Sequence, residues 1–146
     1  MAGEERITAH IAETGESAYA VSIAVSGHVL KGDEPASFGG GNTGPAPYDL
    51  LLAALGECTA MTVRWYARQK SWPLGKVEVR ISHRKEEAAA LPEGAGKTGK
   101  LDVFEKQVIV HGDALTPEQH AKLVDVAAKC PVQRTLESGA IIRTLA

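Results

Sequence analysis

The feature that most constrains the fold is a long helical pattern that is apolar on most of its sides. It begins at about Pro47 and ends before Trp72 and Pro73. Proline suits the first helical position, and Asp49 lies where an acid favours the free N–H groups and the helix dipole. One face at helical spacing comprises Leu51, Ala54, Leu55, Cys58, Met61, Thr62 and Trp65. A helix that is apolar on most sides is a buried one, so we expect it in the centre of the fold or in a subunit interface.

Alternating apolar residues on both sides of this helix predict strands in antiparallel pairs. Before it, residues 7–11 and 19–25 alternate around a turn at 13–16, and a third short strand centres on Val29 and Leu30. The glycine-rich stretch 39–45 is a loop by composition. After the helix, residues 77–82 and 101–110 predict a second hairpin with a flexible connection over 86–100. Residues 140–145 predict a last strand.

A second helix begins with a capping box, with Thr116 at the N-cap, Pro117 at the first helical position and Gln119 at the third. Its predicted inner face comprises Leu123, Val124, Val126, Ala127 and Cys130. Pro131 ends this helix and begins a short one through Leu136, before Gly139. Because the strands form hairpins and the helices are segregated from them, the sequence predicts a single α+β domain over residues 1–146.

Composition and motifs exclude several functional classes. The 146-residue chain has a net charge of −2 and no run of Lys or Arg, so neither nucleic acid nor an anionic membrane is an expected partner. The N-terminus lacks the apolar segment of a signal peptide, and residues 50–63 are too few to cross a bilayer, so we expect a cytoplasmic protein. The five histidines and two cysteines lack metal-ligand spacing, and we expect neither a metal nor a cofactor.

The two cysteines are the candidate functional residues. Cys58 lies within the apolar helix, where a sheltered structural thiol is the ordinary interpretation and where a reactive one needs a cationic or hydrogen-bonding neighbour. Cys130 directly precedes Pro131 and would take the N-cap position of the short helix, where free N–H groups stabilise a thiolate. A helix-ending cysteine without chemistry remains the alternative. Only the tertiary fold can bring the two thiols together.

Two motifs in the correct order resemble those of the OsmC/Ohr family, the osmotically induced protein C and organic hydroperoxide resistance proteins. Residues 44–62, GPAPYDLLLAALGECTAMT, are similar to the family's cysteine-bearing helix. Residues 129–136, KCPVQRTL, are similar to its second-cysteine motif. The order of elements agrees over nearly the whole chain. Residues 61–67 and 72–74 look like the branch that also occurs fused to α/β-hydrolase domains.

The resemblance implies an OsmC-like fold, with antiparallel hairpins packed around a long central helix, in an intertwined homodimer. It also implies thiol-dependent reduction of organic hydroperoxides in defence against oxidative or osmotic stress. Cys58 would be the peroxidatic thiol and Cys130 the resolving thiol. An external dithiol would then reduce the disulfide between them. Apolar walls would favour lipid-like or aryl peroxides over hydrogen peroxide.

The chain departs from the family pattern around the first cysteine. Typical Ohr members carry a Glu ten residues before it, paired with an Arg that activates the thiolate. This chain has Tyr48 at that position, Asp49 as the nearest acid and Arg6 as the only Arg before Cys58. Asp49 and Arg6 are therefore candidate activating residues, and Gln133 stands where the branch usually has His. Two further hypotheses remain: a non-catalytic module that binds a small apolar molecule, and a redox switch that forms the Cys58–Cys130 disulfide without turnover.

Overall fold

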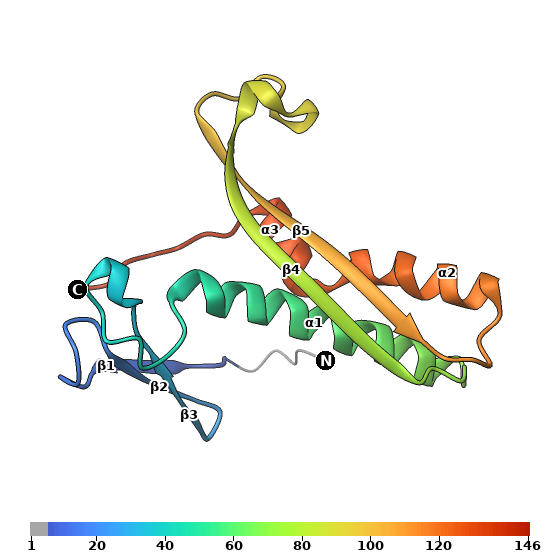
Figure 1. The fold of residues 1–146 in the computed structure, drawn as a ribbon, viewed down its shortest axis with the longest axis horizontal. Helices are drawn as coiled ribbons and strands as arrows, with labels where there is room; N and C mark the ends of the chain where they lie inside the picture. The colour runs from blue at the N-terminus through green and yellow to red at the C-terminus, as the bar shows by residue number, and fades with distance from the viewer. Residues whose placement is uncertain (1–5) are drawn as a thin grey trace. The chain divides into compact units, whose positions relative to one another are not determined.

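The computed structural model describes residues 6–146, which divide into two compact units at the boundary between Leu51 and Leu52. The strands and α-helices follow the chain in the order shown in Figure 1. They are β1 (Ala9–Glu13), β2 (Val21–Val25), β3 (His28–Gly32), α1 (Pro47–Gln69), β4 (Lys76–Glu87), β5 (Lys100–His111), α2 (Pro117–Val126) and α3 (Pro131–Ser138). Short 3-10 turns lie at Ala36–Phe38, Ala88–Ala90, Pro92–Gly94 and Ala127–Lys129. The α+β class is confirmed.

The N-terminal unit contains a three-stranded antiparallel sheet in the order β1-β2-β3. Ile23 of β2 pairs with Ile11 of β1 on one side and with Leu30 of β3 on the other. The predicted hairpin and third strand are therefore confirmed. The loop that follows β3 carries one 3-10 turn, Ala36–Phe38, which the composition did not predict.

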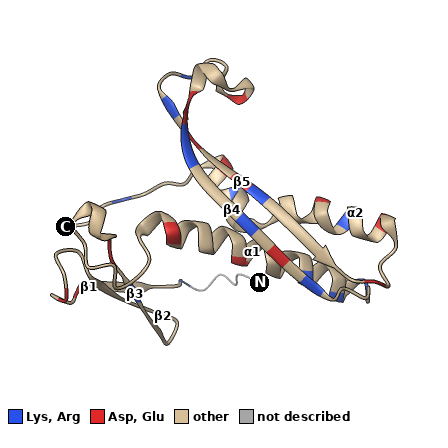
Figure 2. Cartoon of the chain, viewed as in Figure 1, with Lys and Arg blue, Asp and Glu red and all other residues tan. Residues whose placement is uncertain are grey.

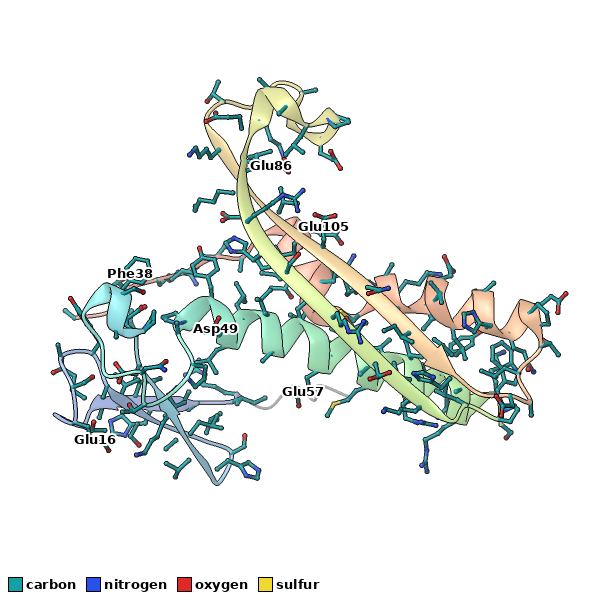
Figure 3. The ribbon with its side chains drawn as sticks, viewed as in Figure 1. Glu16, Phe38, Asp49, Glu57, Glu86 and Glu105 are labelled. Carbon is teal, nitrogen blue, oxygen red and sulfur yellow. The ribbon has the colours of Figure 1, made fainter. Side chains whose placement is uncertain are left out.

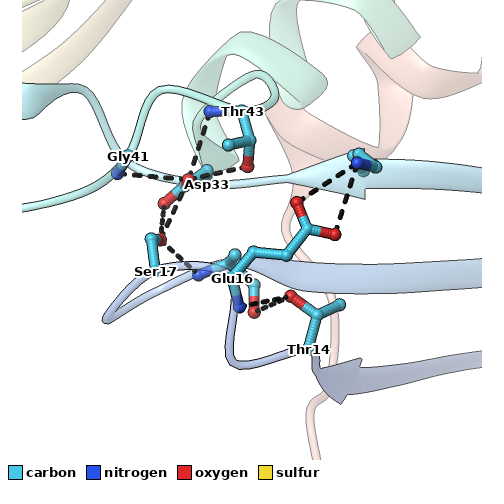
Figure 4. A network of polar contacts seen from close by, with 8 residues as sticks. Thr14, Glu16, Ser17, Asp33, Gly41 and Thr43 are labelled. Carbon is cyan, nitrogen blue, oxygen red and sulfur yellow. Dashed lines mark hydrogen bonds and ion pairs between the residues drawn. The ribbon is translucent and has the colours of Figure 1, made fainter.

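The carboxylate of Asp33 organises the loops of this unit (Figure 4). It accepts hydrogen bonds from the hydroxyls of Ser17 and Thr43 and from the backbone N–H groups of Glu34, Gly41 and Thr43. Burial alone would raise the pKa of Asp33, but these hydrogen bonds outweigh it and hold the pKa well below its usual range. A single buried carboxylate thus fixes the path of the glycine-rich loop that leads to α1.

The second unit is built on the long hairpin of β4 and β5 (Figure 1). Its ladder runs from Lys76 opposite His111 to Glu87 opposite Lys100. The strands therefore extend into the stretch predicted as a flexible connection, and that connection itself contains two 3-10 turns. Arg84 supports the far part of the ladder by binding Glu86 and Glu105, which Figure 3 shows along the hairpin.

Helix α1 is buried along a narrower stripe than predicted. Its fully buried residues are Leu55, Thr59, Val63 and Ala67, spaced four apart. Met61 and Trp65, which share the predicted apolar face, are 52% and 51% exposed. A single chain therefore buries only part of that face, and the alternative location of the remainder, a subunit interface, stays a prediction. The core of the second unit joins α1 to β5 and α2 through Val63, Ala67, Leu74, Val110, Leu123 and Ala127.

Helix α2 begins with the predicted capping box, in which Thr116 and Gln119 exchange hydrogen bonds. Leu123, Val126, Ala127 and Cys130 are buried as predicted, whereas Val124 is exposed. The strand predicted at 140–145 is absent: these residues carry exposed Ile and Leu side chains and no ladder. The alternation there describes a segment suited to a strand, but no strand among residues 6–146 pairs with it.

The charges of the described residues are mixed in sign. Lys and Arg are interspersed with Asp and Glu along β4 and β5, as Figure 2 shows. Among residues 6–146, no helix is both long enough and apolar enough to span a membrane.

Candidate functional site

The second unit brings its two cysteines close together. Cys58 lies on α1 and Cys130 lies at the start of α3, and the Cys58 thiol is near enough to help lower the pKa of Cys130. Both are free thiols. Cys130 is completely buried, as its place on the inner face predicted, whereas Cys58, expected to be sheltered, is partly exposed. The sulfur that a small molecule reaches first is therefore that of Cys58.

Cys130 caps the short helix α3, as the proline motif predicted. Its backbone is extended, with φ −72° and ψ 144°, and its Sγ accepts a hydrogen bond from the backbone N–H of Gln133 at 3.4 Å. The hydroxyl of Thr59 on α1 lies 3.5 Å from the same sulfur. Donors from two helices thus converge on one buried sulfur, which is the environment that favours a thiolate.

Lys106 on β5 provides the cation of the site. Its Nζ donates to Thr59 Oγ1 at 3.0 Å, to the carbonyl oxygen of Ala127 at 2.8 Å and to Gln133 Oε1 at 2.5 Å. The three acceptors belong to α1, to the 3-10 turn before Cys130 and to α3. The ammonium therefore joins the three segments that surround the Cys130 sulfur.

Ionisation at this site follows from burial and its compensation. Burial would raise the pKa of Cys130, but hydrogen bonds from Thr59, the Gln133 N–H and Cys58, together with the charge of Lys106, lower it below its ordinary value. Burial lowers the pKa of Lys106, while its attraction to Cys130, Cys58 and Glu137 opposes that change. The site therefore favours a thiolate at Cys130 beside an ammonium at Lys106.

Sequence reasoning missed Thr59 and Lys106. Thr59 directly follows Cys58 within an apolar helix, where a threonine gives little sign of a role. Lys106 does leave a signal, because it shares the inward side of β5 with Phe104, Val108 and Val110. A charged residue on the inner side of an alternating strand needs buried partners.

The other predicted candidates lie in the N-terminal unit. Asp49 is exposed in the first turn of α1, and its carboxylate accepts the backbone N–H of Ala46 at 2.9 Å. Arg6 is exposed and precedes β1. Their role as activating residues stays a prediction. Glu57, the acid next to Cys58, is exposed on α1 (Figure 3).

The described residues include no cluster of three His, Cys, Asp or Glu side chains suited to a metal ion. His83 instead pairs with Asp102, and His111 pairs with Glu78 on the surface of the hairpin. What the site offers chemically is two thiols, a cation and hydrogen-bond donors, which suffices for thiol oxidation and disulfide formation.

A family model described as OsmC-like protein matches residues 39–144. The match includes both cysteines and all but the last two residues of the second unit. The chain belongs to this family. No curated protein matches the sequence.

Solved structures of low sequence identity share the OsmC fold. An OsmC-like protein from Mycoplasma pneumoniae aligns with a TM-score of 0.69 and 17% identity, over 92% of this chain and 89% of that one. The organic hydroperoxide resistance protein OsmC from Legionella pneumophila aligns with a TM-score of 0.64 and 18% identity, over 92% and 91%. An organic hydroperoxide resistance protein from Elizabethkingia anophelis aligns with a TM-score of 0.66 and 17% identity, over 95% of this chain and 93% of that one.

Proposed function

We propose that this OsmC-like protein reduces organic hydroperoxides with its two thiols. The observation that carries the proposal is the proximity of a partly exposed thiol, Cys58, to a buried sulfur, Cys130, whose surroundings stabilise a thiolate. The first is accessible to a substrate and the second is held ready behind it. Membership of a family whose structural relatives include organic hydroperoxide resistance proteins supports the same reaction.

In the attacking step, the Cys130 thiolate takes the proton of the neighbouring Cys58 thiol, and the Cys58 sulfur attacks the outer oxygen of the peroxide. The O–O bond breaks and the alkoxide leaves, taking the proton back from Cys130. The alcohol departs, and Cys58 is oxidised to a sulfenic acid.

In the resolving step, the Cys130 thiolate attacks the sulfenic sulfur of Cys58. The S–S bond forms and hydroxide leaves. The hydroxide takes up from bulk solvent the proton that Cys130 released when it ionised, and so becomes water. The sum is two sulfurs oxidised to a disulfide while one peroxide becomes an alcohol and water. An external dithiol then reduces the disulfide by exchange and restores both thiols.

Apolar peroxides fit the surroundings of Cys58. Met61 and Trp65 lie three and seven positions further along α1, on the same side of the helix as Cys58, and about half of each is exposed. A lipid-like or aryl group would cover this surface, whereas hydrogen peroxide has no apolar part to bury.

The test combines intact mass with thiol titration after one equivalent of cumene hydroperoxide. We expect wild-type protein to lose both thiols and the mass of two hydrogens, and a dithiol to restore them over repeated turnovers. C58S should keep its remaining thiol, and C130S should stop at an oxidised Cys58. Two thiols that stay free would contradict the proposal and favour a binding module, while a single oxidation without turnover would favour a redox switch.

We further propose that the protein works as a homodimer. Each unit leaves large apolar side chains exposed, among them Ile7, Ile11 and Val29 in the first and Met61, Trp65, Ile141 and Ile142 in the second. Exposed apolar surface of this extent is typical of a subunit interface. Light scattering behind size exclusion should give twice the chain mass, and a monomer at micromolar concentration would contradict it. Because the thiols must be reduced in each cycle, we place the protein in the cytoplasm.

A further inference from the structure

We propose that Lys106 is a positioning residue that acts through Thr59 and Gln133 to hold the Cys130 sulfur as a thiolate ready for disulfide formation. The role of Lys106 in disulfide formation rests on the proposed peroxidase function. The hydrogen bonds that hold the Cys130 thiolate are a property of the reduced protein and can be tested without peroxide. Lys106 makes no hydrogen bond to either sulfur within the described chain. Its charge also acts directly on Cys130, and its hydrogen bonds fix the groups that donate to the sulfur.

The hydrogen bonds of Lys106 require its charged form. An ammonium has three N–H donors and no acceptor. All three are matched, by Thr59 Oγ1, the Ala127 carbonyl oxygen and Gln133 Oε1. A neutral amine has only two N–H groups and would leave one of these oxygens unpaired. The buried contacts therefore select the cation in spite of the cost of burying it.

Thr59 is the group that transmits this charge. A threonine hydroxyl has one proton to donate and lone pairs to accept with. Lys106 occupies a lone pair, so the single proton must choose between two acceptors, the Leu55 carbonyl oxygen at 2.8 Å and Cys130 Sγ at 3.5 Å. Beside a neutral thiol the carbonyl is the better acceptor. When Cys130 is ionised, its charge attracts the proton, which the bound ammonium has already made more acidic.

Gln133 completes the arrangement from the other helix. Its side-chain oxygen binds Lys106, and its backbone N–H binds the Cys130 sulfur. Lys106 thus fixes the residue that supplies the second donor. The other titratable groups facing this cluster are Cys58 on α1 and Glu137 on α3, both of which attract the Lys106 charge.

The experiment measures the thiolate of Cys130 in the reduced protein without peroxide. In a C58S background only one thiol remains, and its ultraviolet thiolate absorbance is followed against pH, with the C58S/C130S protein subtracted to remove tyrosine. We expect K106M to lower the thiolate fraction about tenfold at pH values below the midpoint, the effect of losing one charge-assisted hydrogen bond. K106R, which keeps the positive charge, should restore part of the Cys130 thiolate fraction. K100M, which replaces an exposed lysine of the same strand, should leave that fraction unchanged.

An unchanged thiolate fraction in folded K106M would overturn the proposal, as would an equal loss in K100M. Should K106M fail to fold by circular dichroism, K106Q takes its place, because glutamine keeps side-chain N–H donors and removes the charge. The peroxidase test is separate. If K106M shifts the titration while peroxide leaves wild-type thiols free, the function is wrong and the positioning role stands. If peroxide oxidises the wild-type thiols while K106M titrates as wild type, the function stands and the positioning role is wrong.

Discussion

Thr59→Val isolates one hydroxyl at the centre of the site. The threonine side chain is completely buried, and valine nearly matches its volume, so packing is preserved. The change removes the donor to Cys130 Sγ and the acceptor of one Lys106 N–H. A hydrogen bond to a charged group contributes about 1.5–3 kcal/mol, and each 1.4 kcal/mol is tenfold, so we expect a roughly ten- to hundredfold smaller thiolate fraction of Cys130 below its midpoint pH.

The same substitution should lower the stability of the reduced protein. The orphaned N–H of Lys106 costs about 1–3 kcal/mol, and the lower end applies because Lys106 is only partly buried and water can replace the lost partner. Urea unfolding measures this cost, and thiolate absorbance in the C58S background measures the ionisation. Thr59→Ser is the matched control, because it keeps the hydroxyl and loses only a methyl group. A T59V protein that ionises as readily as T59S would refute the reasoning.

Three further predictions concern the fold and its pH dependence. Leu123→Ala should cost about 2–5 kcal/mol in urea unfolding, in the upper half because the side chain is fully buried in the core, and a cost below 1 kcal/mol would contradict this. Asp33→Asn should lower the melting temperature at neutral pH. Because the pKa of Asp33 is depressed in the folded state, the ionised carboxylate stabilises the fold fully above pH 3.8, and this stability is lost as the pH falls through the lower folded pKa. The difference in melting temperature from wild type should therefore shrink only in strong acid. Since the pKa of Cys130 is also depressed, its contribution is complete above pH 9.0 and lost as the pH falls through the folded value, so reduced wild type should gain stability over C130S as the pH rises toward 9.0.

The sequence predicted the fold well where neighbouring residues within one segment determine the local structure. The capping box at Thr116 and Gln119 fixed the start of α2, and the Cys130–Pro131 pair fixed the start of α3. Alternation identified both hairpins. It failed at residues 140–145 because a strand needs a neighbour, and alternation describes only the segment itself.

The site was less predictable because its parts come from distant elements. The sequence identified both thiols as candidates but did not predict that Cys58 is partly exposed. A helix that is apolar on most sides does not reveal which of its sides is covered by the rest of the fold. Thr59 and Lys106 are 47 positions apart and meet only through the packing of β5 on α1. The inward position of Lys106 in an alternating strand was the one readable sign of a buried cation.

The location of that cation makes a last prediction about the reaction. Typical Ohr members, which this chain resembles, place a Glu where Tyr48 stands, and an Arg pairs with it near the first cysteine. Here the described cation of the thiol site is Lys106, and its hydrogen-bond partners surround Cys130. The charge therefore favours Cys130, the proposed resolving thiol, more than Cys58, the proposed attacking one.

A resolving thiol that is already ionised should close the disulfide faster than Cys58 is oxidised. The sulfenic acid of Cys58 should then escape trapping by dimedone in wild-type protein and be trapped in C130S, where nothing resolves it. K106M should give intermediate trapping, because less of its Cys130 is a thiolate, while exposed-lysine variant K100M should behave as wild type. The adducts are counted by intact mass at fixed peroxide. Heavy trapping in wild type would mean that resolution is the slow step and that the Lys106 arrangement does not serve it.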